Sequence, residues 1–391
     1  MPRRTVALCA SLLLSWLAAC SAAPEPRPAS APRRLGLWVL AEGSHRTLED
    51  PARTPALIAE AERIGATDLF VQVYRRGRSW FPATHADATP FDAIRTRSGR
   101  DPLRDLIDAA HASKLRVHAW FNALALHDNR DAPVLKALGR GAVLVDRGGR
   151  SLLDYPQGDV PPPDRTYLQL DTPGVWLDPA APGVIEELEA IVRELAAAYP
   201  DLDGLHLDFV RHPMALPFTP GSGFAGLDFG YGDAARAAFE TASGKPFARG
   251  SAWDDFRRDS VSQVVRRLRA AIPAKWEHSA AVLPWVDRAY LSALQDWRRW
   301  LEEGWLDFAI AMTYTRDDRL LRYQARGLTR GVGGERVWLG LGSWLFASEP
   351  ARALEQMRIA ESTAPPGIAL FSYDALTEAP ALRTALDADA P

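Results

Sequence analysis

Residues 203–213 read Asp203-Gly204-Leu205-His206-Leu207-Asp208-Phe209-Val210-Arg211-His212-Pro213, an apolar run interrupted by acidic and basic side chains. Side chains alternate across a β-strand, so Leu205, Leu207 and Phe209 are expected on one face. Gly204, His206 and Asp208 then share the opposite face. If the apolar face packs on helices, Asp208 points inward near the carboxyl end of a strand, which is where barrel enzymes hold their catalytic groups.

Similar apolar runs recur from Leu35 onward and alternate with amphipathic stretches, which is typical of parallel strands wrapped by helices. Eight such pairs predict an α/β fold, a (β/α)8 TIM barrel. The expected strands are 35–40, 68–74, 116–123, 202–211, 278–283, 308–314, 337–344 and 368–374. The expected helices include 55–64, 102–113, 183–199, 253–272, 290–303, 320–326 and 351–361.

Two connections are long, roughly residues 126–182 after the third strand and 213–250 after the fourth. Because both follow strands, both are expected on the catalytic face of the barrel. The second is rich in glycine, proline and aromatic residues. This composition predicts a loop that shapes a cleft and does not form a second domain.

An inward carboxylate at a strand end is costly unless neighbouring groups pair with it, and Arg211 and His206 are the expected partners of Asp208. The alternative is a structural ion pair that stiffens the top of the barrel. Asp203 precedes the strand and is expected to be structural. A role for Asp208 in the functional site is the favoured interpretation, because apolar packing meets a purely structural need.

Polar groups recur at the ends of other expected strands. His118, Trp120 and Asn122 share one face of the third strand, Gln72 and Tyr74 fall together on the second, and Arg75 and Arg78 follow it. Met312 and Tyr314 share a face, as do Ser372 and Asp374. The predicted substrate-binding residues are His206, Arg211, Asn122, His118, Gln72, Tyr74, Tyr314, Trp285 and Trp344.

The amino-terminal residues predict export. Arg3 and Arg4 precede an apolar run over residues 6–19 that is too short to span a bilayer, which predicts a signal peptide at 1–19. The run ends in Leu17-Ala18-Ala19-Cys20, which resembles a bacterial lipobox and predicts lipidation of Cys20; an ordinary cleavage site is the alternative. Residues 20–33 are expected to form a proline-rich tether to a barrel at 34–391. We therefore expect a lipid-anchored protein of the bacterial envelope, in the outer membrane or periplasm.

Composition excludes several classes of partner. The chain carries 46 Lys+Arg against 49 Asp+Glu and has no basic block, so nucleic acid is not an expected partner. It contains no P-loop, no dinucleotide fingerprint and no Cys/His pattern with zinc spacing, so neither a cofactor nor a metal is expected. The chain has 13 Trp. Most are expected in the core, and the others are suited to stacking on sugar rings.

Several segments, in order over about residues 34–376, resemble the glycosyl hydrolase-like 10 (DUF187) barrels. They are Arg34-Leu-Gly-Leu-Trp-Val, Phe70-Val-Gln-Val-Tyr-Arg-Arg-Gly-Arg, His118-Ala-Trp-Phe-Asn, the 203–213 segment and Met312-Thr-Tyr. The resemblance implies a (β/α)8 fold, an envelope location and activity on a glycan such as peptidoglycan strands stripped of their stem peptides. Many members read Asp-Asp-Tyr where this chain reads Asp208-Phe209-Val210, so the second acid of that pattern is absent.

The Asp-Gly-x-x-x-Asp spacing also resembles the fourth-strand motif of amylase-type barrels, whose last Asp is a nucleophile. By this analogy Asp208 attacks the anomeric carbon or stabilises an oxocarbenium-like state. A second carboxyl group is then needed, about 5–5.5 Å away for retention or about 6.5–9.5 Å away for inversion. The fifth strand ends in Ala-Val-Leu-Pro-Trp and offers none.

Four acidic residues at strand ends or in loops are candidates for this second group: Glu42, Asp374, Asp228 and Asp317. Glu42 is the first choice because it follows the first strand directly, beside apolar walls that disfavour its ionised form. Asp374 is the second choice, with capping of the final helix as its alternative role.

The favoured hypothesis is a glycoside hydrolase acting on a polysaccharide, with Asp208 essential. The absent fifth-strand acid motivates an alternative, a non-catalytic barrel that only binds glycan. A third hypothesis is a metal-dependent deacetylase that uses His206, Asp208 and His212.

Overall fold

The computed structural model describes residues 33–155, 174–213, 228–331 and 333–388. Within these residues, eight parallel strands pair in the order β1-β11-β10-β9-β8-β7-β4-β2, and β2 returns to β1, so the sheet closes into a barrel. The strands are β1 (Arg34–Val39), β2 (Asp68–Arg75), β4 (Arg116–Asn122), β7 (Gly204–Asp208), β8 (Glu277–Val282), β9 (Phe308–Met312), β10 (Val337–Gly342) and β11 (Gly367–Phe371). The predicted (β/α)8 fold is confirmed.

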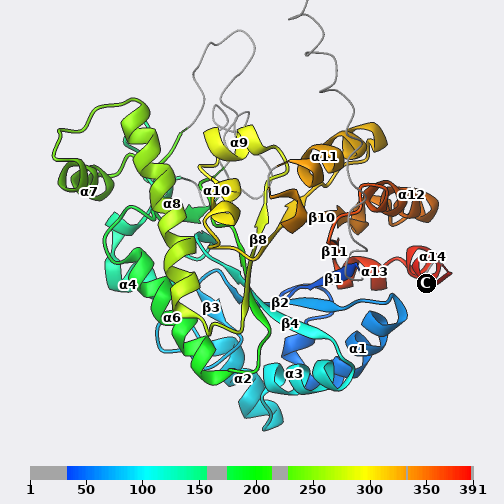
Figure 1. Ribbon diagram of the computed structural model, residues 1–391. Helices are drawn as coiled ribbons and strands as arrows, with labels where there is room; N and C mark the ends of the chain where they lie inside the picture. Colours follow the sequence, from blue (N-terminus) through cyan, green and yellow to red (C-terminus); the bar gives the residue numbers. More distant parts are fainter. Residues whose placement is uncertain (1–32, 156–173, 214–227, 332, 389–391) are drawn as a thin grey trace, which may run out of the picture. The chain divides into compact units, whose positions relative to one another are not determined.

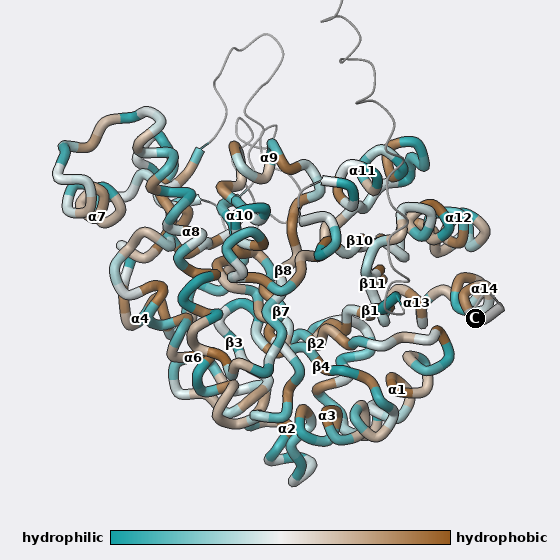
Figure 2. The backbone as a smooth tube through the Cα atoms, in the orientation of Figure 1, coloured by the Kyte–Doolittle hydropathy of each residue, from teal (hydrophilic) through white to brown (hydrophobic). Residues whose placement is uncertain are grey.

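Helices surround this barrel (Figure 1). They are α1 (Thr54–Arg63), α2 (Thr89–Ser98), α3 (Pro102–Ala112), α4 (Pro133–Leu138), α6 (Val184–Ala198), α7 (Asp233–Ser243), α8 (Ser251–Ala271), α9 (Val286–Leu291), α10 (Trp297–Glu302), α11 (Asp318–Arg330), α12 (Pro350–Glu361), α13 (Tyr373–Thr377) and α14 (Pro380–Ala388). Along several of them the hydropathy changes every few residues between apolar and polar, as a helix with one buried face requires (Figure 2).

The two long connections follow β4 and β7, as predicted, but they contain more structure than expected. The first holds a two-stranded antiparallel pair, β5 (Ala125–His127) with β6 (Val175–Trp176). The second holds α7, whose Phe239 packs with Tyr231 and Trp253 in a small apolar cluster of its own. The single helix expected at 290–303 is wrong: α9 and α10 are separate, with residues 292–296 between them.

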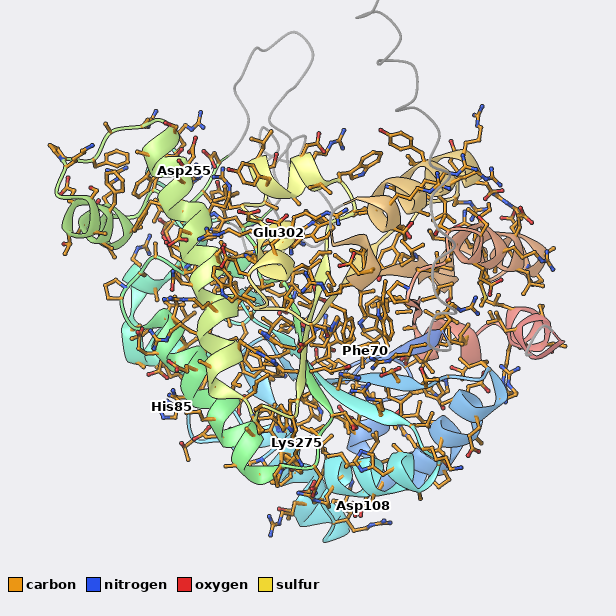
Figure 3. The ribbon with its side chains drawn as sticks, viewed as in Figure 1. Phe70, His85, Asp108, Asp255, Lys275 and Glu302 are labelled. Carbon is orange, nitrogen blue, oxygen red and sulfur yellow. The ribbon has the colours of Figure 1, made fainter. Side chains whose placement is uncertain are left out.

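Apart from that small cluster, the apolar core has two parts. A large cluster fills the space between strands and helices and includes Leu205 and Leu207. A smaller one fills the barrel interior and consists of Trp38, Phe70, Trp120, Phe308, Ile310, Trp338 and Ala369. Phe70 lies among the strands, whereas the exposed His85, Asp108 and Lys275 lie at the periphery (Figure 3).

Glycine makes room for these interior rings. A Cβ at Gly367 would approach the Trp338 ring to 2.2 Å, and one at Gly36 would approach Phe70 to 2.5 Å. Such contacts are too close for any side chain, so the strands carry glycine where a neighbouring strand supplies an aromatic ring. The rings occupy the middle of the barrel and leave its carboxyl-terminal end for a site.

The amino-terminal end of the barrel is closed by charged residues. Arg34 donates to Asp68 from Nε at 2.9 Å and to Glu277 at 3.0 Å, and His118 Nε2 lies 2.8 Å from Asp68. Arg116 reaches Glu277 at 2.8 Å. These residues begin or lie near the start of β1, β2, β4 and β8, so the cluster links four strands at the end opposite Asp208.

Within the described residues, no helix is both long and apolar enough to cross a membrane. The signal peptide at 1–19, Cys20 and the tether up to residue 32 lie outside the described residues.

Candidate functional site

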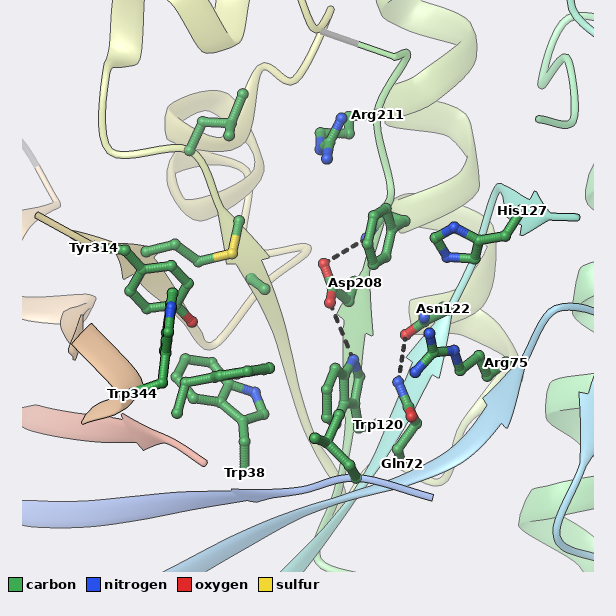
Figure 4. Close-up of a pocket in the computed structure, with 16 residues that line it drawn as sticks. Trp38, Gln72, Arg75, Trp120, Asn122, His127, Asp208, Arg211, Tyr314 and Trp344 are labelled. Atoms are coloured by element: carbon green, nitrogen blue, oxygen red, sulfur yellow. Dashed lines mark hydrogen bonds between the residues drawn. The ribbon is translucent and has the colours of Figure 1, made fainter. Parts of the chain in front are cut away.

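A cavity of about 390 Å³ lies at the carboxyl ends of the strands. It has a polar wall from β2, β4, the end of β7 and the segments that follow β4 and β7. Its aromatic wall comes from β1, β4, β11 and the segments that follow β9 and β10. Six predicted site residues line it: Asp208, Gln72, Asn122, Arg211, Tyr314 and Trp344. Figure 4 shows Asp208 between the two walls.

The Asp208 carboxylate is fixed by two donors. Its Oδ2 accepts a hydrogen bond from Trp120 Nε1 at 3.2 Å, and its Oδ1 accepts one from the Phe209 backbone N–H at 2.7 Å (Figure 4). Asp208 ends β7 and is 9% exposed, so it is nearly buried and still reaches the cavity. The inward position at the end of the strand is as predicted, but one of the two expected partners, His206, is engaged elsewhere.

His206 lies one layer below Asp208, among the interior rings. Its Nε2 accepts from the indole N–H of Trp38 at 3.2 Å, so Nδ1 carries the proton and donates to Ser279 Oγ at 2.9 Å. Burial, with smaller effects from His118 and His278, lowers the pKa of His206 well below its usual value. His206 is therefore a neutral core residue that does not line the cavity.

Gln72 and Asn122 are the two amide side chains of the polar wall. Gln72 Nε2 donates to Asn122 Oδ1 at 3.4 Å (Figure 4). Gln72 Oε1 accepts from the Ala41 backbone N–H at 3.3 Å. These bonds fix both amides, so the NH2 group of Asn122 is oriented to donate to a ligand.

Arg75, His127 and Arg211 complete the polar wall, and His127 was not predicted. The Arg211 guanidinium lies 5.1 Å from the Trp176 ring centroid and 5.2 Å from that of Phe209, which orients its planar donor group. His127 and Phe209 both adopt left-handed backbone conformations, with φ of 54° and 51°. Non-glycine residues rarely do so, and such strain is concentrated at functional sites.

The left-handed turn also changes where Phe209 points. Simple alternation placed this ring on the helix-facing side, but the strand ends at Asp208 and Phe209 lines the cavity. There its ring meets His127 edge-on at 5.1 Å. That prediction was wrong because the regular strand ends at Asp208, three residues before the expected end at residue 211.

Five rings build the aromatic wall: Trp38, Trp120, Tyr314, Trp344 and Phe371. Phe371 lies within 6.1 Å of the other four, measured between ring centroids. Burial, and to a lesser extent the charge of Asp208, raises the pKa of Tyr314 well above its usual value. The Tyr314 hydroxyl therefore stays protonated and can donate a hydrogen bond near Asp208.

Besides His206, three predicted substrate-binding residues do not line the cavity. His118 belongs to the charged cluster at the amino-terminal end of the barrel. Trp285 precedes α9, with the Arg288 guanidinium 5.4 Å from its ring. Tyr74 is displaced by an irregularity between Gln72 and Tyr74 in the pairing of β2 with β4. Its ring stacks on Phe121 at 4.2 Å in the helix-facing core, away from Gln72.

Glu42, the first choice for a second acid, does not line the cavity. The expected apolar surroundings are wrong: the guanidinium groups of Arg75, Arg76 and Arg78 lie 3.4, 3.7 and 3.8 Å from its carboxylate. Glu42 thus supports Arg75, which does face the cavity. Glu42 therefore contacts a residue of the polar wall without lining the cavity itself.

Asp374 is buried beside the first loop. Its Oδ1 accepts hydrogen bonds from Ser44 Oγ at 3.1 Å and from the His45 backbone N–H at 2.9 Å. It does not cap α13, because the Ser372 side chain does. It lines a second groove beside the cavity, described below.

The other two acid candidates have structural partners. Asp228 pairs with Arg257 and Arg147, each at 2.8 Å, and accepts from the Tyr231 hydroxyl at 2.6 Å. Burial opposes its ionisation, but Arg257 and these hydrogen bonds lower its pKa to about 2. Asp317 caps α11 by accepting from the backbone N–H groups of Arg319 and Leu320. Among the described residues that line the cavity, only Asp208 carries a carboxyl group.

The residues proposed for a metal-dependent deacetylase are not brought together. Within the described residues, the group that could hold a metal ion is Asp68, His118 and Glu277, whose ligand atoms lie within 4.8 Å of one another. Arg34 donates to both carboxylates, so a guanidinium already occupies this position. His206, Asp208 and His212 form no such group.

Residues 34–323 match the family described as glycosyl hydrolase-like 10. The chain belongs to this family. The match includes Asp208, both of its hydrogen-bond donors and the whole polar wall. Trp344 and Phe371 lie beyond the matched range, so part of the aromatic wall comes from the last two strands of the barrel.

Named relatives agree with this assignment. The chain is similar to glycosyl hydrolase DigH of Escherichia coli O6:H1, at 26% identity over 277 residues, which is 65% of this chain and 55% of that protein. It is also similar to glycosyl hydrolase YngK of Bacillus subtilis, at 22% identity over 278 residues, which is 66% of this chain and 48% of that protein. The chain therefore spans about half the length of the curated relatives it matches.

Solved structures share the barrel. The glycoside hydrolase domain of PgaB (BpsB) from Bordetella bronchiseptica superposes with a TM-score of 0.62 at 15% identity, covering 90% of this chain and 98% of that one. The catalytic domain of β-amylase from Paenibacillus polymyxa gives 0.57 at 10% identity, covering 92% and 98%. At these identities the likeness establishes the fold of this glycosyl hydrolase-like 10 protein.

Asp178 is a buried carboxyl group that the sequence analysis did not single out. Asp178 follows β6, is 2% exposed and accepts a hydrogen bond from the Ala180 backbone N–H at 3.0 Å. Burial raises its pKa to about 6, and the Ala180 bond and Arg257 only partly oppose this. The native state thus holds a proton that the unfolded chain releases at lower pH.

We therefore expect the contribution of Asp178 to stability to fall as the pH rises from about 4 to about 6, where the native state binds the extra proton. An Asp178→Asn variant mimics the protonated form and should be more stable than the parent at pH 7, by up to about 3 kcal/mol. Urea denaturation at pH 4 and pH 7 measures this. The exposed Asp108→Asn variant is the control and should show no pH-dependent difference. An equal effect of Asp178→Asn at both pH values would contradict the expectation.

Proposed function

We propose that this protein is a glycoside hydrolase whose reaction depends on Asp208. The observation that carries the proposal is the place of that carboxylate: it ends a barrel strand, is held by two N–H donors and lies between a hydrogen-bonding wall and an aromatic wall. Polar groups bind sugar hydroxyls, and flat rings pack against the C–H faces of sugars. The family description and the names of the relatives support the same reaction class.

In the proposed reaction the ionised Asp208 acts at the anomeric carbon in one of two ways. Its negative charge stabilises the positive charge that develops there, or its oxygen attacks that carbon directly. Its two donors hold the carboxylate in place before the substrate arrives, so little reorganisation is needed during the reaction. The protonated Tyr314 hydroxyl and the Asn122 amide group orient the sugar beside it.

The proposed substrate is a polysaccharide of the bacterial cell envelope. Peptidoglycan glycan strands without stem peptides are the candidate that the family resemblance suggests. The amino-terminal sequence supports the matching location, because a short basic start, an apolar run and Cys20 fit an exported, lipid-anchored protein. We propose that the anchor holds the barrel at the membrane facing this substrate.

One observation favours a second candidate function. Since Asp208 is the one carboxyl group among the described residues lining the cavity, a barrel that binds glycan without cleaving it also fits the geometry.

A polysaccharide panel separates the two functions. The full mature chain is incubated with peptide-free peptidoglycan strands, chitin, cellulose and uronic-acid polymers, and new reducing ends are counted. We expect release from at least one polymer, with the same rate in the presence of EDTA. Binding by pull-down without release from any polymer would favour the non-catalytic function. Loss of activity in EDTA would favour metal-dependent chemistry.

A further inference from the structure

A second groove adjoins the cavity around Asp208. It has a volume of about 510 Å³ and is lined by residues that follow β1, β10 and β11. Leu40 and Trp344 line both the groove and the cavity, so the two hollows adjoin at these residues. A linear polymer that leaves the cavity across Trp344 therefore enters the groove.

Trp344 lies between the two hollows with its ring held in place. It is 42% exposed, a large fraction for an indole. Tyr314 meets the ring edge-on at 4.8 Å, Phe371 does so at 5.4 Å, and a Cβ at Gly342 would approach the ring to 2.7 Å. Because neighbours fix the ring, its exposed surface is a preformed stacking platform with little side-chain entropy to lose on binding.

The groove also offers hydrogen-bond acceptors. Asp374 is 5% exposed and uses Oδ1 to accept from Ser44 Oγ and the His45 backbone N–H, whereas its Oδ2 has no hydrogen-bond partner within the described residues. A buried carboxylate oxygen without a donor is costly. Ser44 and Glu378 line the same groove and are exposed. Donors supplied by a ligand would satisfy this set.

We propose that the groove is a second sugar-binding subsite, which holds a neutral, hydroxyl-bearing ring of the same glycan chain whose neighbouring ring lies at Asp208. The inference rests on the proposed function. The ring stacks on Trp344, and its hydroxyls donate to Asp374, Ser44 and Glu378. Two acidic side chains exclude a ring that carries a carboxylate, since like charges repel in a partly buried groove.

The test uses chain length as its variable. Affinities of chito-oligosaccharides with two to six rings are measured by calorimetry in an Asp208→Asn background, with mass spectrometry to confirm that the sugars stay intact. Affinity is expected to rise about tenfold at the length that first fills both hollows, then level off. Oligogalacturonates of the same lengths, which carry a carboxylate on every ring, are expected to show no such step.

Two substitutions locate the step. Ala347→Trp places a large ring in the groove and should abolish the step while leaving the affinity for the shortest oligomer unchanged. Ser348→Trp is the matched control: it adds the same ring at the next exposed position, outside the groove lining, and should keep the step. Asp374→Asn removes one acceptor and should reduce the step severalfold, with thermal melting used to confirm folding.

A step that survives in Ala347→Trp, an absent step in the parent, or no binding of any chito-oligosaccharide would each overturn the second subsite. These outcomes are independent of the reducing-end assay with the wild-type chain. Hydrolysis without a step leaves the glycosidase standing, and a step without hydrolysis leaves the subsite standing.

Discussion

An Asp208→Asn variant is expected to cleave the substrate glycan about a thousandfold more slowly than the parent, or slower still. Asparagine keeps the size of the side chain, and its single amide oxygen can still accept from either Trp120 or the Phe209 backbone N–H, so the fold and the cavity should be retained. What is lost is the negative charge that stabilises an oxocarbenium-like state or attacks it. The loss should therefore appear in kcat more than in KM.

Asp203→Asn on the same segment is the matched control. Asp203 accepts from the Val117 backbone N–H at 2.7 Å and from His111 at 2.9 Å, before β7 begins, so its change should affect stability and leave kcat near the parent value. Initial rates of reducing-end release at several glycan concentrations, with circular dichroism for folding, measure both variants. Full activity in Asp208→Asn would remove this residue from the reaction.

The barrel could be predicted because burial imposes periodicity on the sequence. Leu205 and Leu207 pack toward the helices and His206 and Asp208 point inward, as alternation requires. The expected strand 202–211 was too long, since the regular strand covers only Gly204–Asp208. The apolar pattern continues past the point where the backbone turns, and only the conformation of Phe209 reveals the end.

Backbone irregularities account for the errors in the site. The displaced pairing after Gln72 places Tyr74 in the outer core, and a one-residue irregularity of this kind leaves no mark in a pattern of apolar residues. The same holds for the left-handed backbone conformation of His127, which enters the site from a short antiparallel strand. No glycine or proline, the residues that usually mark such irregularities, stands at either position.

Electrostatic neighbours were equally hard to foresee. Glu42 was expected beside apolar walls, but Arg75, Arg76 and Arg78 fold back from the end of β2 and surround it. Arg34 and Asp68 begin neighbouring strands and meet Glu277, which is far away in sequence. Contacts between residues so far apart in sequence form only when the barrel closes. The sequence predicts that the barrel closes, but it does not show which side chains then meet.

That charged cluster leads to the largest expected effect on stability. Asp68 is fully buried and accepts from Arg34, from His118 at 2.8 Å and from Thr67 at 2.6 Å. Burial opposes its ionisation, but hydrogen bonds from His118 and Arg34 and their charges lower its pKa well below the usual value. Stability from this group is therefore present above the unfolded pKa and is lost as the pH falls toward the folded one.

An Asp68→Ala variant is expected to lose about 3–5 kcal/mol of unfolding free energy at pH 7, because the change leaves Arg34 and His118 without their shared carboxylate. The shift of the urea midpoint measures this loss, provided that the dependence of the unfolding free energy on urea concentration keeps the same slope. Asp201→Ala, which removes an exposed partner of Arg104, should cost less than about 1 kcal/mol. Since the cluster lies at the opposite end of the barrel from Asp208, the folded fraction of Asp68→Ala should keep its kcat. A loss of stability no larger than that of Asp201→Ala would show that the cluster does not hold the strands together.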